Sequence, residues 1–536
     1  MKLTYEGILD AAAWERAGVK LPGHDIGAML AETEKAPVWV HFGAGNIFRG
    51  FIAGLAQRLL DAGEMKAGIV AAETFDGEVI EKIYQPFDSM ALAVSLNGDG
   101  TMGAAVQASI ARGLYVGKDG DWEILKGIFR NPSLQMVSFT ITEKGYALKD
   151  IKGDITPAAR ADMDKGPARP GHAMGAVAAL LYERYLCGGA PVAMVSMDNC
   201  SRNGEKLRAG VTEMAESWEK AGLVSDGFVK WLEDESRVSF PWSMIDKITP
   251  RPSQAVADML EKRGVEDMAA VTTAKHTYIA PFVNAEAPQY LVIEDRFPGG
   301  RPPLEKAGVY MTDRETVNRT ERMKVTTCLN PLHTALAVFG CLMGYEKICD
   351  EMKDELLVAL VRRIGYVEGL PVVTDPGILD PRAFIDEVVG ERLPNPFMPD
   401  TPQRIATDTS QKIPVRFGET IKSYMADPKL DTSSLTAIPL AIAGWLRYAL
   451  GVDDEGREMA LSPDPMLDML RGAMAEVKFM DPDSARGEKV RALMGNSLLF
   501  GVSLEEAGLA DKVLNDLARM LEGPGAVRRT LKEVLA

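Results

Sequence analysis

The sequence predicts an α/β fold in which a doubly wound sheet is followed by a mostly α-helical C-terminal domain. Three observations predict it. Short apolar runs alternate with helical periodicity over residues 1–300, an order typical of parallel sheets. A glycine turn joins the first clear strand to a helix, and from residue 301 onward the apolar pattern is helical. Proline and glycine cluster at 298–303, so we place the domain boundary there, giving domains of residues 1–300 and 301–536.

The first predicted strand, residues 36–42, runs into a glycine turn and then into a helix over 52–62. This arrangement brings backbone N–H groups and a helix N-terminus onto the pyrophosphate of a dinucleotide. Gly43 permits the tight turn, Gly45 lets a phosphate approach closely, and Arg49 offers a cation. The usual third glycine is missing, so a plain turn is the alternative. The pattern predicts a Rossmann-like, dinucleotide-binding N-terminal domain.

A second strand, residues 67–72, ends at Glu73. An acid at this point binds the adenosine ribose hydroxyls and repels a 2′-phosphate, which favours NAD over NADP. Glu73 is therefore our candidate and Asp76 the second choice. The alternative is an acid that only caps a helix.

Two further strands are predicted at 134–142 and 191–197, with a helix over 173–185 between them. Ligands of parallel sheets bind beyond the carboxyl ends of strands. The polar segments 142–146 and 198–204 lie at such ends, although Asp, Asn and Gly also build turns that have no function.

Outside these strands the expected elements are helices. Residues 1–36 are predicted to be a polar lead with one short helix. In the C-terminal domain, helices are predicted at residues 331–345, 352–368, 439–450, 465–475 and 504–535.

The stretch 321–340 places Lys324, Asn330 and His333 at the start of an apolar segment. Asn330 followed by Pro331 is typical of an N-cap and the first residue of a helix. A lysine beside a buried helix start is desolvated, which lowers its pKa toward that of a general base. The alternative is a capped core helix with a structural histidine and a solvated lysine.

The bulk composition restricts the partners. The net charge of −16 argues against nucleic acid and anionic membranes, and no run of about 18 apolar residues predicts a membrane span. The five cysteines and five histidines show no metal-ligand spacing, so we expect no metal. Free thiols fit the cytoplasm. We expect a monomer or a small homo-oligomer.

Several separated segments resemble the polyol-specific long-chain dehydrogenases, the family that includes mannitol 2-dehydrogenase, fructuronate reductase and tagaturonate reductase. The resemblance extends from about residue 38 to the 440s. It rests on residues 43–51, 142–146, 198–204, 239–250, 289–302, 321–340 and 404–412.

The resemblance implies a metal-independent, NAD-dependent reductase of a keto sugar or keto sugar acid. It implies that Lys324 is the general acid and base, that Asn199 and Asn330 polarise the carbonyl oxygen, that Glu321 relays the proton, and that His333 bonds a substrate hydroxyl. The implied cofactor residues are Gly43, Gly45, Asn46, Arg49, Glu73 and Glu143. The implied substrate residues are Asp246, Lys247, Arg404 and Lys412.

Among the family's substrates we favour D-fructuronate and D-mannonate, because Lys247, Arg404, Lys412 and Arg416 form a basic set suited to a carboxylate. The alternatives are mannitol 2-dehydrogenase or tagaturonate reductase activity. A third alternative, from a different class, is a catalytically inactive dinucleotide-binding sensor.

One departure from the family pattern is the spacing from Lys324 to Asn330, which is six residues where the family usually has five. We expect segment 325–329 to absorb the extra residue by a bulge or a non-helical turn. Because Pro331 marks a helix start, we expect Lys324 to precede that helix and Asn330 to cap it. Lys324 and Asn330 should then converge on one cavity between the domains.

Overall fold

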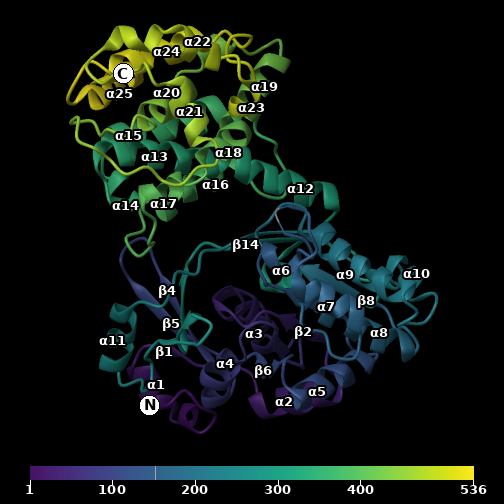
Figure 1. Cartoon of the computed structure of the whole chain (residues 1–536). Coiled ribbons are helices and arrows are strands. Elements are labelled where there is room, and N and C mark those ends of the chain that lie inside the picture. Colours follow the sequence, from purple (N-terminus) through teal and green to yellow (C-terminus); the bar gives the residue numbers. More distant parts are fainter. Residues whose placement is uncertain (151) are drawn as a thin grey trace. The chain divides into compact units, whose positions relative to one another are not determined.

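The computed structural model describes residues 1–150 and 152–536. The chain forms two compact units (Figure 1). Unit 1 comprises Met1–Asn97 and Thr101–Asn318, and unit 2 comprises Gly98–Gly100 and Arg319–Ala536. The change of unit at Asn318 falls inside helix α12 (Arg314–Met323), whereas the sequence-based boundary was placed at residue 300.

Unit 1 is built on a parallel sheet with the strand order β6-β3-β2-β7-β8-β9. The strands are β2 (Trp39–Phe42), β3 (Ile69–Glu73), β6 (Ile110–Tyr115), β7 (Met136–Phe139), β8 (Val192–Ser196) and β9 (Val238–Ser239). The strand order reverses between β2 and β7, which opens a crevice at their carboxyl ends. The predicted α/β class and the four predicted strands are confirmed.

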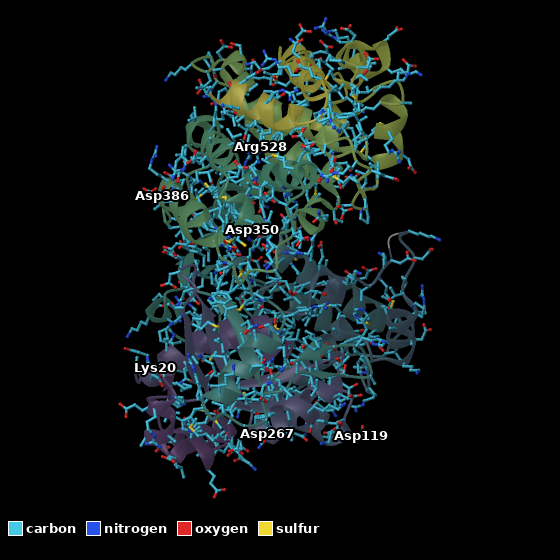
Figure 2. All side chains as sticks on the ribbon, turned by 90° about the vertical axis from the view of Figure 1, so that its left-hand side faces the viewer. Lys20, Asp119, Asp267, Asp350, Asp386 and Arg528 are labelled. Atoms are coloured by element: carbon cyan, nitrogen blue, oxygen red, sulfur yellow. The ribbon has the colours of Figure 1, made fainter. Side chains whose placement is uncertain are left out.

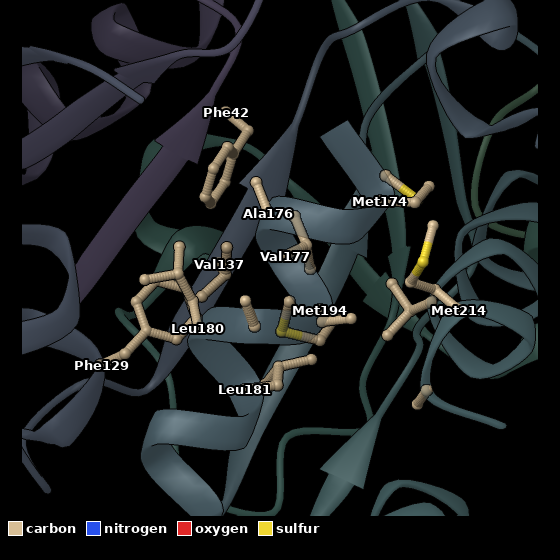
Figure 3. Packing of buried hydrophobic residues seen from close by; sticks show 14 of the residues in the cluster. Phe42, Phe129, Val137, Met174, Ala176, Val177, Leu180, Leu181, Met194 and Met214 are labelled. Atoms are coloured by element: carbon tan, nitrogen blue, oxygen red, sulfur yellow. The ribbon is translucent and has the colours of Figure 1, made fainter. Parts of the chain in front are cut away.

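Both faces of this sheet are covered, because successive strand residues point to opposite faces. Val40 and Phe42 of β2 face one hydrophobic cluster, and Trp39 faces the other. Figure 3 shows Phe42 and Val137 packing beside Leu180 of α8. The first face carries α5 (Asp119–Arg130), α7 (Pro157–Lys165), α8 (Ala173–Leu186), α9 (Asn203–Lys220) and α10 (Phe228–Glu233). The second carries α2 (Ile26–Lys35), α3 (Ala53–Asp61) and the π-helical turns η2 (Phe48–Ile52) and η3 (Ile80–Tyr84).

Sequence patterns missed two smaller sheets of unit 1, with orders β1-β5-β4-β13 and β10-β14-β15. Their strands are β1 (Val19–Lys20), β4 (Ala91–Leu96), β5 (Met102–Gln107), β13 (Phe282–Glu286), β10 (Ser243–Asp246), β14 (Tyr290–Glu294) and β15 (Tyr310–Thr312). The prediction that residues 1–36 form a polar lead with one short helix was also wrong, because this segment contains two helices and a strand. The helices are α1 (Ala11–Arg16) and α2.

The remaining elements of unit 1 are short. They are α4 (Gly77–Val79), α6 (Glu143–Tyr146), α11 (Gln254–Lys262), β11 (Val271–Thr272) and β12 (Tyr278–Ile279).

Unit 2 is helical throughout its described elements (Figure 1). Its helices are α13 (Asn330–Met343), α14 (Ile348–Glu351), α15 (Glu355–Arg362), α16 (Pro381–Glu387), α17 (Pro402–Ala406), α18 (Thr409–Ile413), α19 (Glu419–Ala426), α20 (Ala437–Tyr448), α21 (Leu467–Ala473), α22 (Glu488–Leu493), α23 (Ser497–Phe500), α24 (Ala510–Met520) and α25 (Ala526–Leu535). The single helix predicted at 504–535 was wrong. Gly523 and Gly525 adopt positive φ on either side of Pro524 and separate α24 from α25.

Within the described residues, the helical run Arg314–Met343 is long and apolar enough to cross a membrane. Its most apolar stretch is 78% buried inside the protein, and a core helix of a soluble protein passes the same test. The surface of the protein carries charged side chains. Asp119, Asp267 and Asp386 are exposed examples (Figure 2).

Candidate functional site

The glycine turn after β2 requires its first glycine. Gly43 has φ +106°, and a Cβ there would lie 2.2 Å from the Thr140 carbonyl oxygen of the segment after β7. Only glycine fits this close approach. At Gly45 a Cβ would meet nothing within 4 Å, so the turn is open on that side. The helix begins at Asn46, and the turn therefore presents free space beside a helix N-terminus, as a phosphate requires.

Glu73 holds this turn from the end of β3. Its Oε2 accepts the Ala44 N–H at 3.0 Å, and its Oε1 accepts the N–H groups of Phe75 and Asp76 at 2.7 and 3.1 Å. A carboxylate offers about four acceptor sites. Contact between Glu73 and a ribose stays a prediction. Asp76 accepts the hydroxyls of Thr273 and Thr277, which makes it the weaker candidate.

Arg49 faces the interior of unit 1 and is 1% exposed. Its guanidinium donates to the Ala280 carbonyl oxygen at 2.8 Å and to Asn46 Oδ1 at 2.9 Å. Burial lowers the pKa of Arg49 to about 10. The structure thus makes Arg49 a support for Asn46 and the turn, and direct contact of either residue with the cofactor stays a prediction.

The carboxyl ends of β7 and β8 carry the other predicted residues of unit 1. Glu143 is exposed at the start of α6 and forms an ion pair with Lys206. Asn199 is exposed in the turn that follows β8. Both lie at the edge of the sheet where the glycine turn lies, which is where ligands of such sheets bind.

Asp246 and Lys247 stand at the end of β10. Asp246 is buried. Because successive side chains of a strand point to opposite faces of the sheet, Lys247 points to the other face. The Lys247 ammonium donates to the Glu286 carbonyl oxygen and lies over the Phe51 ring. It lines a cavity of about 370 Å³ within unit 1, beside Arg58. A role for either residue in substrate binding stays a prediction.

In unit 2, Lys324 lies inside a continuous helical run. The π-helical turn η6 (Lys324–Cys328) connects α12 to α13, and the Leu329 N–H donates to the Lys324 carbonyl oxygen at 3.1 Å. A π turn adds one residue without breaking the helix. The expected local bulge is confirmed. Lys324 is 3% exposed.

Two details of the prediction were wrong. Lys324 does not precede the helix, and Asn330 is not its N-cap. Asn330 is the first residue of α13, and Leu329 precedes it without a capping side chain. The physical reason is that Leu329 already takes the N-cap position, because its φ of −129° is not helical and its carbonyl oxygen accepts the His333 N–H at 3.1 Å.

His333 presents a neutral imidazole with an unused polar atom. Its Nε2 is buried and has no hydrogen-bond partner within the described residues, since Asp400 Oδ2 lies 3.6 Å away. Burial, followed in order by the charges of Arg416, Arg404, Lys412 and Arg392, lowers the pKa of His333 to about 3. An orphaned nitrogen of this kind indicates a partner supplied by a ligand.

The charges of four cations therefore act on His333 within unit 2, where the Asp400 carboxylate also lies 3.6 Å from its Nε2. Arg416 donates to Thr334 Oγ1, and Lys412 donates to the carbonyl oxygens of Ile405 and Thr407. Arg404 is paired with Asp400. Burial, followed by Arg416, lowers the pKa of Lys412 to about 8. Sequence reasoning missed Arg392, because it precedes the matching segment and is brought close only by the fold.

Glu321 lies in α12, one turn before Lys324, at the surface of unit 2. Its relay role is not tested by this geometry and stays a prediction. Across residues 1–150 and 152–536, no group of three or more His, Cys, Asp or Glu side chains could hold a metal ion.

The chain resembles known proteins over its whole length. Residues 37–306 match the family model of the mannitol dehydrogenase Rossmann domain, and residues 316–521 match that of the mannitol dehydrogenase C-terminal domain. The chain is 54% identical to D-mannonate oxidoreductase of Thermotoga maritima, over 100% of this chain and 99% of that protein. It is 29% identical to mannitol 2-dehydrogenase of Aspergillus fumigatus, over 97% of each.

Two solved structures are similar over nearly the whole chain. D-sorbitol dehydrogenase in substrate-free form has a TM-score of 0.75 and 27% identity, covering 94% of this chain and 98% of that one. Pseudomonas fluorescens mannitol 2-dehydrogenase in ternary complex with NAD and D-mannitol has a TM-score of 0.70 and 25% identity, covering 100% and 99%.

Proposed function

Because the chain belongs to the mannitol dehydrogenase family, we propose that it is an NAD-dependent D-mannonate oxidoreductase that interconverts D-mannonate and D-fructuronate. The observation that carries the choice of a sugar acid is the set of four cations around His333. The 54% identity to a D-mannonate oxidoreductase over the full length supports the same choice.

The glycine turn fits the dinucleotide, because it is open at Gly45 and is fixed from behind by Glu73 and Tyr84. In the reduction, D-fructuronate, NADH and a proton give D-mannonate and NAD⁺. The cofactor supplies the hydride that reaches the carbonyl carbon of the substrate, or accepts it in the reverse direction.

The residues of the chain handle the proton and the developing negative charge. We assign proton delivery to Lys324, which is buried as a desolvated acid and base should be. The amides of Asn330 and Asn199 polarise the carbonyl oxygen, because positioned donors stabilise an alkoxide. Glu321 relays the proton from solvent.

The substrate's carboxylate and hydroxyls are assigned to the cation set. A carboxylate gains charge-assisted hydrogen bonds from a guanidinium, and the Arg416 side chain keeps donors beyond the one used by Thr334. His333 Nε2 accepts a hydrogen bond from a substrate hydroxyl or donates one to it. The hydroxyl thus supplies the partner that His333 Nε2 lacks. Asp246 and Lys247 remain secondary candidates for the same substrate.

The test is NADH oxidation with D-fructuronate, D-tagaturonate and D-fructose. We expect kcat/KM to be at least about a hundredfold higher for D-fructuronate than for D-fructose, because a site built for a charged group rejects the analogue that lacks it. Preference for D-fructose would assign mannitol 2-dehydrogenase activity, and preference for D-tagaturonate would assign the corresponding reductase.

The Lys324→Ala variant tests the mechanism separately from the substrate. We expect kcat to fall by about 10²–10⁴-fold, the usual contribution of general acid–base catalysis. Lys429→Ala, at an exposed position of the same unit, is the control and should retain activity. Full activity of Lys324→Ala would remove the lysine mechanism and leave the family assignment intact.

We also propose that the enzyme works in the cytoplasm, without nucleic acid or membrane partners, as a monomer or a small homo-oligomer. The net charge of −16 supports the absence of polyanionic partners.

A further inference from the structure

A strained backbone conformation lies at the edge of the dinucleotide crevice. Thr142, between β7 and α6, has φ 66° and ψ 158°. This region is essentially reserved for glycine, and a β-branched residue occupies it only when its surroundings impose it. The Thr142 side chain is exposed, so packing of that side chain does not impose the conformation.

The carboxylate of Asp198 imposes it. Asp198 Oδ1 accepts the Thr142 N–H at 3.0 Å, and Oδ2 accepts the Ile141 N–H at 2.9 Å. The Tyr146 hydroxyl donates to Oδ2 as well and lies 2.8 Å from Ser196 Oγ. Asp198 therefore holds the chain on both sides of the Thr142 dihedral angles, because the two N–H groups lie before them in the chain and Tyr146 lies after them.

This turn adjoins the parts of the site that the function uses. The Thr140 carbonyl oxygen is the atom that excludes a side chain from Gly43, and His41 Nε2 lies 2.8 Å from Thr140 Oγ1. Asp198 itself directly precedes Asn199, the proposed amide donor. One carboxylate thus connects the segments that follow β7 and β8, on the β7 side of the crevice.

We propose that Asp198 is a positioning residue that holds the Thr142 turn in its strained form and thereby shapes the NAD crevice between the glycine turn and Asn199. We assign it no contact with the reacting atoms. The proposal rests on the family's use of NAD, and it assigns a role to a residue that the reaction itself does not name.

The experiment measures the NADH dissociation constant by fluorescence titration in four forms: wild type, Asp198→Asn, Thr142→Gly and the double variant. The two N–H groups bind different oxygens of Asp198, and an amide replaces one of these oxygens by a donor NH2, so Asp198→Asn should raise Kd about tenfold or more. Glycine adopts the turn without strain, so in the Thr142→Gly background the same change should raise Kd by only about threefold or less. A general loss of stability would not be rescued in this way.

A gentler variant covers the case in which Asp198→Asn does not fold. Tyr146→Phe removes one of the three hydrogen bonds that the Asp198 carboxylate accepts and should raise Kd by about threefold, an effect that Thr142→Gly should abolish. Asp234→Asn makes the same chemical change in an exposed turn, where Asp234 accepts the Ser236 N–H, and should leave Kd unchanged.

Two results would overturn the inference. The first is that Asp198→Asn binds NADH as tightly as wild type. The second is that Asp198→Asn raises Kd by the same factor in the wild-type and Thr142→Gly backgrounds. Steady-state kinetics add a second readout, since KM for NADH should rise more than kcat falls. The titration needs no sugar, so an enzyme that binds NADH but ignores D-fructuronate would refute the proposed function while this test remained valid.

Discussion

At the scale of single residues, Glu73 combines two tasks in one carboxylate. It is predicted to bind the ribose, and it holds the Ala44 N–H of the glycine turn. We expect wild type to prefer NADH over NADPH at least tenfold, about 1.4 kcal/mol, because a carboxylate repels a 2′-phosphate.

Glu73→Gln should reduce the preference for NADH and keep a side-chain oxygen that accepts the Ala44 N–H. Glu73→Ser should reduce the preference and also weaken the binding of both cofactors. The measurement is kcat/KM with each cofactor. Equal use of NADH and NADPH by the native protein would show that the acid of the second strand is misassigned.

A second residue makes stability depend on pH. Glu351 of α14 is fully buried, and neither carboxyl oxygen has a hydrogen-bond partner within the described residues. Burial raises its pKa from 4.5 to about 9. Between these values the folded state keeps the proton and the unfolded state loses it, so stability falls as pH rises through that window.

Glu351→Gln removes the titration. We expect its melting temperature to fall by about 4 °C less than that of wild type between about pH 5.5 and about pH 8.5. Glu355→Gln, at an exposed position of the next helix, is the control and should follow wild type. Parallel curves for wild type and Glu351→Gln would mean that the carboxyl is ionised when folded.

At the scale of elements, the π turn η6 explains the one departure from the family spacing. Deleting Thr326 should convert the turn to regular α-helix while keeping Lys324 and Asn330 in register. We expect this variant to retain measurable activity with reduced stability, because the Thr326 hydroxyl bonds the Arg322 carbonyl oxygen.

Deleting Thr334 instead, one turn after the start of α13, shortens the helix where there is no extra residue to remove. It should rotate the apolar face out of the core and abolish activity. Activity assays and circular dichroism of both deletions check this. A Thr326 deletion as inactive as the Thr334 deletion would show that the π turn itself is required.

The sequence predicted the elements whose signals are local. The strand, glycine turn and helix at 36–62 and the apolar strands β7 and β8 were found because their patterns lie within a few residues. The β5 strand, rich in Ala and Gly, was missed because its partners β1 and β4 provide its stability, and β1 is distant in sequence.

The same distinction applies to the site. One short stretch of sequence identified Lys324, Asn330 and His333. The roles of Arg392, Tyr84 and Asp198 depend on contacts made only in the folded chain. The mistaken cap at Asn330 came from a local rule, proline at the first helical position, whereas in the structure the cap is Leu329 and Pro331 is the second residue of the helix. Local patterns thus indicated the chemistry, and tertiary contacts determine how it is held.

At the scale of the whole molecule, the chain carries a net charge of −16, yet it gathers four cations around His333. This local excess is what an anionic substrate needs, since fields of distant surface charges are screened over about 8–10 Å. The insertion that had suggested an inactive sensor is absorbed by the π turn, so that objection to an enzyme disappears.

The last prediction concerns metal ions. Metal-dependent alcohol dehydrogenases use the ion as a Lewis acid that polarises the substrate oxygen. Here that task is assigned to Lys324 and the amides, and the described residues provide no cluster of metal ligands. Incubation with a chelator, followed by its removal, should therefore leave kcat and the melting temperature unchanged. Activity that is lost with the chelator and returns with zinc would contradict the lysine mechanism, because the ion would then perform what we assign to Lys324.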